Sequence, residues 1–233
     1  MRIQTIWAVL FILPVWLFFP GNEGKIQAAP LNPVEVAKKL QMTYDKSVGL
    51  QADFHQETLL KMTRRKKTGS GRVTFLKPSH MRWDYLTPDH QILISDGKTI
   101  SMYFENERQL IITSAEDYLQ SDVTYSFFSG TGDILRDFEV LAPDIQAGKS
   151  EDSYLIKLVP KNPHPHVAYL YLWVDVNTFL IQRLQIIDHF DTITDIVFDN
   201  LRVLEKDEAD SSLKINSGLF TFIPPPGTEI IRQ

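Results

Sequence analysis

The chain has 233 residues, of which 43% are hydrophobic and 11% aromatic, and its formal net charge is −5. A chain of this length and apolar content can form one large domain or two small ones. It has no cysteine, which excludes disulfides, thiolate metal sites, a cysteine nucleophile and lipid attachment at an N-terminal cysteine. The acidic balance, with one short basic run at Arg64–Lys67, argues against nucleic acid as a partner.

The first residues follow the pattern of a secretory signal peptide. Arg2 supplies a positive end, and the apolar run Ile6–Phe19 that follows is shorter than the ~20 residues that a transmembrane helix needs. We expect cleavage after Ala29, so that residues 1–29 form the signal peptide and residues 30–233 form a single extracytoplasmic domain. Because Ile26 or Gln27 occupies the place where a small residue is preferred, an uncleaved anchor is the alternative.

An amphipathic helix is predicted for residues 33–46. Asn32 can cap its N-terminus, Pro33 suits the first helical position, and Glu35 stands where a capping-box acid belongs. Apolar residues then recur at helical spacing, which predicts that one stripe of the helix is buried against another element. The residues of this stripe are Val36, Ala37, Leu40 and Tyr44.

Short strands, with turn signals about every 8–12 residues, are predicted for most of the remaining chain. Two segments differ: the aromatic-rich residues 114–130 fit helical spacing, and residues 133–138 fit a helical turn. The polar residues 64–71 are predicted as a loop. About ten to eleven strands with so few helices predict a mainly β fold, built as one antiparallel sheet or barrel. The expected strands are residues 50–55, 72–76, 81–85, 92–94, 99–104, 109–113, 154–160, 168–174, 179–187, 192–203 and 220–222.

The most informative stretch is residues 75–97. Met81, Trp83 and Tyr85 alternate with polar residues, which is the period of a half-buried strand. Asp96-Gly97 predicts a type I′ hairpin turn. Large apolar side chains on one face, without a catalytic polar cluster beside them, indicate a surface that holds an apolar ligand. An ordinary closed core is the alternative, and periodicity alone favours the core.

Catalytic and metal-binding patterns are weak in this chain. It has neither Gly-x-Ser-x-Gly nor Gly-x-Gly-x-x-Gly. The only metal-like clusters are His164-Pro-His166 and Asp188-His-Phe-Asp191, and both fall at predicted turns, where polar residues are common. We therefore expect no enzyme, no metal and no cofactor, because a hydrolase would need a convergent acid–base set. The basic run Arg64–Lys67 is either a solvated loop or a contact for a membrane surface or a partner.

Several short motifs occur in order along the chain. The central motif is Lys77-Pro-Ser-His-Met-Arg-Trp83, and the others are Phe54-His-Gln56, Gly69-Ser-Gly71, Pro88, Gln91, Ser95-Asp-Gly97 and Phe220-Thr-Phe-Ile-Pro-Pro-Pro-Gly227. In the order and spacing of these motifs the chain resembles the LolA family, the periplasmic carriers of outer-membrane lipoproteins. The resemblance covers nearly all of the chain after the expected signal peptide.

This resemblance implies an unclosed antiparallel β-barrel whose helices cover an apolar cavity that receives lipoprotein acyl chains. It also implies a monomeric periplasmic carrier without nucleic-acid partners. Such a carrier takes its cargo from an inner-membrane lipoprotein-releasing ABC transporter and passes it to an outer-membrane lipoprotein receptor. A periplasmic regulator of the same fold that senses lipids or lipoproteins, or a carrier of another lipid, is the alternative.

The resemblance and the apolar pattern together indicate cavity and lid positions. Family members often carry arginine immediately before the motif proline, where it helps to close the helical lid. Here the residue is Lys77, a point charge rather than a planar fork, and it is expected either to latch the lid or to be a plain turn residue. The expected cavity residues are Phe54, Phe75, Trp83, Ile92, Ile94 and Tyr103, and the other expected lid residues are Leu119, Phe127 and Phe128.

Overall fold

A computed structural model of the chain describes residues 31–119, 132–145, 152–204 and 218–233. All of these residues lie in one unit, Leu31–Gln233. The expected signal peptide over residues 1–29 lies outside the described residues. None of the helices in the described ranges is long and apolar enough to span a membrane.

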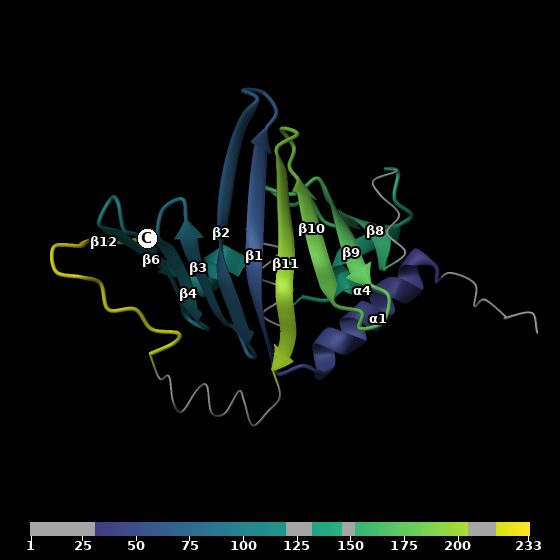
Figure 1. The fold of residues 1–233 in the computed structure, drawn as a ribbon, viewed down its shortest axis with the longest axis horizontal. Coiled ribbons are helices and arrows are strands. Elements are labelled where there is room, and N and C mark those ends of the chain that lie inside the picture. The colour runs from purple at the N-terminus through teal and green to yellow at the C-terminus, as the bar shows by residue number, and fades with distance from the viewer. Residues whose placement is uncertain (1–30, 120–131, 146–151, 205–217) are drawn as a thin grey trace, which may run out of the picture. The chain divides into compact units, whose positions relative to one another are not determined.

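The described strands form one twelve-stranded sheet with the order β12-β6-β5-β4-β3-β2-β1-β11-β10-β9-β8-β7 (Figure 1). Each strand runs antiparallel to its neighbours, except that β12 runs parallel to β6. Because β12 and β7 end this order, the sheet is unclosed. The strands are β1 (Gly49–Leu60), β2 (Arg65–Leu76), β3 (His80–Thr87), β4 (Gln91–Asp96), β5 (Thr99–Phe104), β6 (Gln109–Ser114), β7 (Phe138–Leu141), β8 (Ser153–Pro160), β9 (Tyr169–Asp175), β10 (Ile181–Ile187), β11 (Ile193–Leu204) and β12 (Glu229–Arg232).

The predicted mainly β, unclosed fold is confirmed, but some strands differ from the sequence prediction. β7 and β12 are not predicted because each has only four residues, too few to show an alternating pattern. β2 begins at Arg65, so most of the basic run lies in a strand paired with β1 instead of in a loop. The predicted strand at residues 220–222 is wrong, because this segment is a turn followed by irregular chain.

Helix α1 (Pro33–Lys46) begins with both halves of the predicted capping box. The side-chain oxygen of Asn32 accepts a hydrogen bond from the Glu35 N–H at 2.9 Å, and the Glu35 carboxylate accepts one from the Asn32 N–H at 3.1 Å. The predicted stripe of α1 is buried, which confirms the helical pattern. α4 (Ile134–Asp137) confirms the predicted helical turn. The predicted helix over residues 114–130 begins as α2 (Ala115–Leu119), and its later residues lie outside the described ones.

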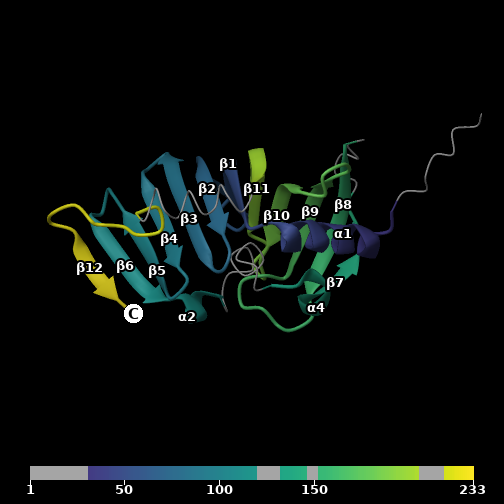
Figure 2. The ribbon, with the colours of Figure 1, turned by 90° about the horizontal axis from the view of Figure 1, so that it is seen from below.

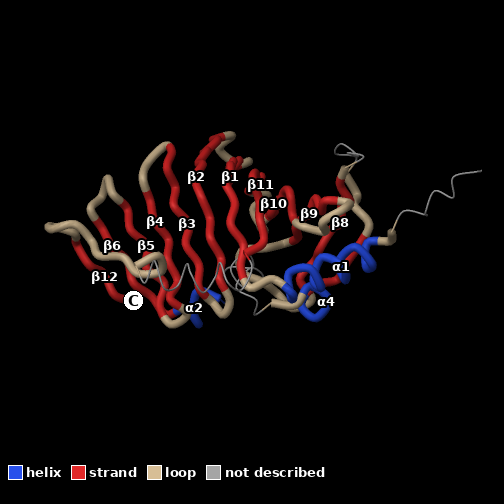
Figure 3. Tube along the Cα trace, turned by 60° about the horizontal axis from the view of Figure 1, so that its bottom comes forward, coloured by secondary structure: helices blue, strands red, loops and turns tan. Residues whose placement is uncertain are grey.

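Strand alternation gives the sheet two faces, and the helices lie on one of them. We call this the inner face, because Leu40 of α1, Ala115 of α2 and Ile134 of α4 share one buried cluster with its strands. The three helices are seen on this side in Figure 2. They lie toward the strand ends opposite the tip of the β1–β2 hairpin (Figure 3). The inner face is therefore an apolar layer between the sheet and its helices.

The outer face of the N-terminal half of the sheet is covered by residues 218–222. Phe220 is buried there among side chains of β2, β4, β5 and β6, and the Phe222 ring lies 4.6 Å from the ring of Tyr103. The Arg82 guanidinium donates to the Leu219 carbonyl at 3.0 Å. Asp84 orients this guanidinium through two hydrogen bonds of 2.7 Å. The segment is thus held by both ring packing and a charge-assisted contact.

The outer face of the C-terminal half carries a second small cluster around Tyr171 and Trp173. The Lys157 ammonium lies 4.4 Å from the ring centre of Tyr169 and 2.6 Å from the Asp144 carboxylate. Asp144 also accepts the Tyr171 hydroxyl hydrogen bond. The hydrogen bonds from Lys157 and Tyr171 stabilise the charged carboxylate, so they lower the pKa of Asp144 to about 2.

The β4–β5 turn differs in type from the sequence prediction. A type I′ turn needs a positive φ at both central residues, whereas only Gly97 of the pair Gly97-Lys98 has one, at 87°. The Asp96 carboxylate accepts hydrogen bonds from the N–H groups of Lys98 and Thr99 at 2.8 and 2.7 Å. These bonds provide a local closure for the turn.

Replacing Asp144 by Asn tests the outer cluster through its pH dependence. The native carboxyl has a lower pKa than it has in the unfolded chain, so its contribution to stability is fully present above about pH 4. That contribution is lost as the pH falls toward the native pKa of about 2. We expect Asp144→Asn to be less stable than the wild type at pH 6, and the two to converge near pH 2.

Urea unfolding at a series of pH values gives the difference in unfolding free energy between the two proteins. The difference isolates Asp144 from the other carboxyls, which titrate in both proteins. A constant difference between pH 6 and pH 2 would contradict the assigned ion pair.

Candidate functional site

The inner face carries a cluster of aromatic side chains from four strands. Phe54 of β1 is fully buried, and its ring lies 4.7 Å from that of Trp83 and 4.9 Å from that of Tyr85, both on β3. Phe75 of β2 and Phe198 of β11 lie 5.9 and 6.4 Å from Trp83. The hydroxyl of Tyr85 donates to the side chain of Gln56 at 2.9 Å. This part of the face therefore offers broad apolar surface with its one phenol already paired.

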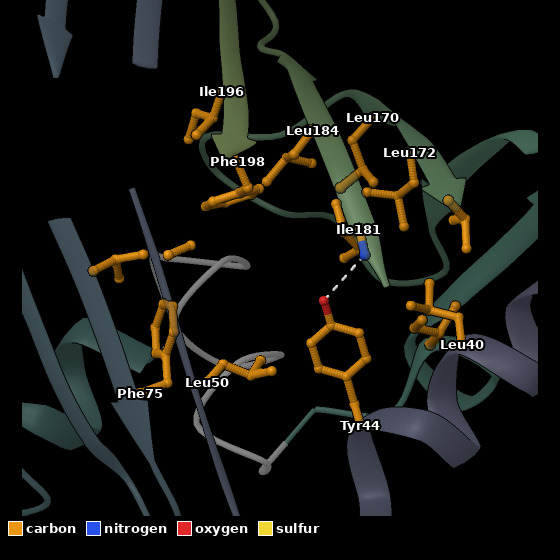
Figure 4. Packing of buried hydrophobic residues seen from close by; sticks show 14 of the residues in the cluster. Leu40, Tyr44, Leu50, Phe75, Leu170, Leu172, Ile181, Leu184, Ile196 and Phe198 are labelled. Carbon is orange, nitrogen blue, oxygen red and sulfur yellow. Dashed lines mark hydrogen bonds between the residues drawn. The ribbon is translucent and has the colours of Figure 1, made fainter. Parts of the chain in front are cut away.

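Over β8 to β11 the inner face is mostly aliphatic, and α1 packs on this part of it. Leu40 and Tyr44 of α1 point toward the side chains of β9, β10 and β11, including Leu172, Leu184 and Phe198 (Figure 4). The Tyr44 hydroxyl accepts a hydrogen bond from the Ile181 N–H at 3.2 Å. Burial raises the pKa of Tyr44 well above its usual range, so this phenol stays neutral. The helix thus contributes an apolar stripe and one polar tie to the sheet.

Two more polar contacts hold α1 in place. The Lys77 ammonium donates to the Tyr44 carbonyl at the C-terminal end of the helix, where the unpaired carbonyls favour a cation. Partial burial lowers the pKa of Lys77, and the charge of Asp45 opposes this shift. In the helix middle, the side-chain oxygen of Gln41 accepts from the Ile134 N–H of α4 at 3.0 Å. The cover is therefore attached to the turn after β2, to α4 and to β10.

The metal-like motifs of the sequence do not come together as a metal site among the described residues. In the described part of the chain, no group of three or more His, Asp or Glu side chains could hold a metal ion. The two metal-like motifs build turns instead: Asp188 accepts from the N–H groups of Phe190 and Thr192, and His189 bonds to the His164 carbonyl. Among the described residues, the inner face is built almost entirely of apolar side chains.

The family described as "Outer membrane lipoprotein carrier protein LolA" matches residues 45–211, well over half of the chain. The chain belongs to the LolA family. It is 27% identical over 196 residues to the outer-membrane lipoprotein carrier protein of Nitrosomonas europaea, covering 84% of this chain and 88% of that one. It is 24% identical to the protein of the same description from Alkalilimnicola ehrlichii, covering 99% and 96%.

A crystal structure of an uncharacterized conserved protein from Thermus thermophilus is similar in fold. Its TM-score is 0.50 at 12% identity, and the match covers 86% of this chain and 98% of that one. This likeness concerns the fold alone. It agrees with the unclosed β architecture of this LolA-family chain.

The predicted cavity residues divide between the two faces. Phe54, Phe75 and Trp83 lie together on the inner face. The expectation that Ile92, Ile94 and Tyr103 share this wall is wrong, because they lie in the outer cluster with Phe220. In the register of β3 and β4, Trp83 pairs with Leu93, so the neighbours of Leu93 point to the opposite face. The run Ile92-Leu-Ile94 is apolar on both faces, so its pattern does not predict which of these residues face inward.

The predicted lid residues have different outcomes. Lys77 contacts the Tyr44 carbonyl of α1, and its role as a latch stays a prediction. The side chain of Leu119, and Phe127 and Phe128 altogether, lie outside the described residues. The expected cavity residues leave out Tyr85, which belongs to the predicted apolar face of its strand, and Phe198. Both continue an alternating pattern, Met81-x-Trp83-x-Tyr85 and Ile196-x-Phe198, which could have identified them.

Replacing Lys77 by Met tests the attachment of α1. Met retains an apolar stem of similar length but removes the donor, so one charge-assisted hydrogen bond is lost while the Tyr44 carbonyl keeps its bond from the Ser47 N–H. We expect the free energy of unfolding to fall by about 1 kcal/mol. We also expect faster amide hydrogen exchange in the last turn of α1, with largely unchanged exchange in β1 and β2.

Lys46→Met is the matched control, because Lys46 is an exposed cation at the same helix end. Lys77→Arg should restore slow exchange if donation to the carbonyl is the stabilising feature. Equal effects of Lys77→Met and Lys46→Met would show that only the charge near the helix end matters.

Proposed function

We propose that this protein carries lipoproteins through the periplasm with their acyl chains held against the inner face. The observation that carries the proposal is the aromatic cluster around Phe54 and Trp83, which belongs to the same buried apolar layer as the stripe of α1. Membership of the LolA family and the names of the relatives, outer-membrane lipoprotein carrier proteins, support lipoproteins as the cargo. The proposed role is binding and transfer, without chemical conversion of the cargo.

Loading requires the cover to move. Phe54, Phe75 and Trp83 are at most 5% exposed in this structure, so an acyl chain can reach them only if neighbouring residues move. α1 lies on the sheet by side-chain packing and a few polar contacts, and it is not part of the strand ladder. We infer that it moves away from the inner face while the sheet stays intact.

The strength of acyl binding sets how cargo leaves. Burying one methylene contributes about 0.8 kcal/mol, so one acyl chain of about 15 methylenes gains on the order of 12 kcal/mol gross. Release of several such chains into water would be very slow. Cargo therefore passes directly between docked proteins: from an inner-membrane ABC transporter onto this carrier, and from the carrier to an outer-membrane receptor. The relative affinities of these partners then give the transfer its direction.

The binding of a fluorescent fatty-acid probe tests the inner face with two paired variants. Trp83→Ala removes a large part of the aromatic cluster, and we expect the probe affinity to fall at least tenfold, about 1.4 kcal/mol. Ile94→Ala truncates a buried side chain on the outer face. It should destabilise the protein by about 2–5 kcal/mol while changing the probe affinity less than twofold.

Mass spectrometry of lipids bound to protein purified without detergent identifies the cargo. Diacylglyceryl lipoprotein supports the proposal, whereas another lipid class would make the protein a carrier of that lipid. The inner face is a closed core if the wild type contains no lipid and takes up no probe. The same conclusion follows if Trp83→Ala and Ile94→Ala lower the affinity for the probe equally.

A further inference from the structure

The β1–β2 and β10–β11 hairpins place their tips side by side. The Lys61 ammonium lies 3.0 Å from the Asp191 carboxylate of the neighbouring tip, and Leu59 pairs with Ile193 at the last position of the β1–β11 ladder. Both tips stand together at one end of the strands in Figure 1. They form one continuous structure, which we call the paired tips, made of residues 59–67 and 188–193.

The paired tips project beyond the neighbouring strand. β2 pairs with β3 only from Ser70 onward, so residues 65–69 have β1 as their ladder partner in the described chain. This end of β1 is far from the cover: α1 ends just before Gly49, at the other end of the same strand. Twelve residues of strand span about 40 Å, which separates the tips from the Lys77 contact.

Large apolar side chains stand at the very end of the tips. Met62 of the first turn is 85% exposed, and Phe190 of the second is 72% exposed. Solvent-exposed apolar side chains of this size lose stabilisation that burial would provide. Their position at the most projecting turns suits insertion into a surface better than packing within this chain.

Cations stand immediately behind these apolar residues. Lys61 and Lys66 form ion pairs with Asp191 and Glu57. Arg64, Arg65 and Lys67 are exposed, and each makes no ion pair among the described residues. The whole chain has a net charge of −5, whereas the paired tips carry a local excess of cations. This end of the molecule can therefore attract an anionic surface.

We propose that the paired tips dock on the surface of an anionic phospholipid bilayer. Met62 and Phe190 enter the interface, and Arg64, Arg65 and Lys67 contact the headgroup phosphates. Apolar tips backed by cations are the pattern by which peripheral proteins bind such interfaces. An acidic protein partner would match the cations but not the two projecting apolar turns, so the bilayer is the better match.

Docking in this way orients the molecule. The tips face the lipid, and the end of the sheet with Lys77 and the C-terminus of α1 points away from it. The attachment is reversible, because three cations and two apolar side chains bind far more weakly than a membrane-spanning helix. This inference does not depend on the identity of the cargo, since none of its residues lies on the inner-face aromatic cluster.

Co-sedimentation with vesicles tests the proposal with the purified wild-type protein. The vesicles are phosphatidylcholine alone or mixed with phosphatidylglycerol, at low and at high ionic strength. We expect binding to the mixed vesicles, weakened by salt. Each cation near an anionic surface contributes about fivefold to partitioning. The triple variant Arg64→Gln, Arg65→Gln, Lys67→Gln should therefore bind on the order of a hundredfold more weakly.

Apolar insertion has its own variant and readout. Met62→Ser combined with Phe190→Ser should weaken binding at least tenfold. Because the chain has no cysteine, Met62→Cys labelled with an environment-sensitive fluorophore should shift to shorter emission wavelengths on mixed vesicles. The control is Lys38→Gln, Lys46→Gln, Lys98→Gln, which removes three exposed cations elsewhere and should change binding less than twofold.

Each result decides the proposal. It is overturned if the wild type does not bind mixed vesicles better than pure phosphatidylcholine, or if the tip variants and the control triple bind alike. Tip variants must also retain the urea-unfolding midpoint of the wild type, which shows that they are folded. A wild type that binds vesicles but no acyl probe would refute the carrier function and leave the docking surface intact.

Discussion

The inner face of the sheet needs a cover. An apolar face built from aromatic and aliphatic side chains of many strands is far larger than the patches that water-exposed monomers tolerate, and each Å² left in water costs about 25 cal/mol. α1 provides part of this cover with a stripe that includes Leu40 and Tyr44. Because the helix packs on the sheet without joining its ladder, cover and sheet can separate without breaking a strand pair. The packing of α1 on the inner face thus stabilises the closed arrangement. In the function that we propose, the same packing separates when cargo is loaded.

The outer face is closed by two smaller clusters. Residues 218–222 lie over β4 and β5, with Phe220 and Phe222 packed on aromatic and aliphatic neighbours and Arg82 fixed between Asp84 and the Leu219 carbonyl. The other half is capped by the contacts of Lys157 with Asp144 and the tyrosine rings. These contacts combine charge with ring packing. The inner side is closed by the largest buried cluster and by the polar contacts of Tyr44, Gln41 and Lys77, and exchange there is our proposal.

The two ends of β1 have different properties. At Gly49 the strand follows the end of α1 and lies near the Lys77 contact. At Leu60 it reaches a projecting turn with an exposed Met62 and a basic strand behind it. A long, continuous strand separates the covering contacts from the proposed lipid contact, so a membrane-docked molecule could still open its cover toward a protein partner.

Most of the architecture could be predicted from the sequence because its signals are local. The capping box at Asn32 and Glu35 and the helical spacing of α1 involve residues a few positions apart. Alternation in Met81-x-Trp83-x-Tyr85 is equally local, and it predicted the strand β3 whose Met81 and Trp83 are buried together on the inner face. The four-residue strands β7 and β12 were not predictable, because so short a strand is specified by its partner rather than by its own pattern.

By itself, the sequence determined the mainly β class, the amphipathic helix that starts the domain, and the family resemblance carried by the Lys77–Trp83 motif. Only the tertiary structure decided which face each strand presents. Ile92-Leu-Ile94 is apolar at every position, so its direction depends on pairing with β3, where Trp83 meets Leu93. The tertiary structure also decided that Lys77 contacts the Tyr44 carbonyl and that the tips of the β1–β2 and β10–β11 hairpins lie side by side. These contacts join residues far apart in the chain, and no local pattern encodes them.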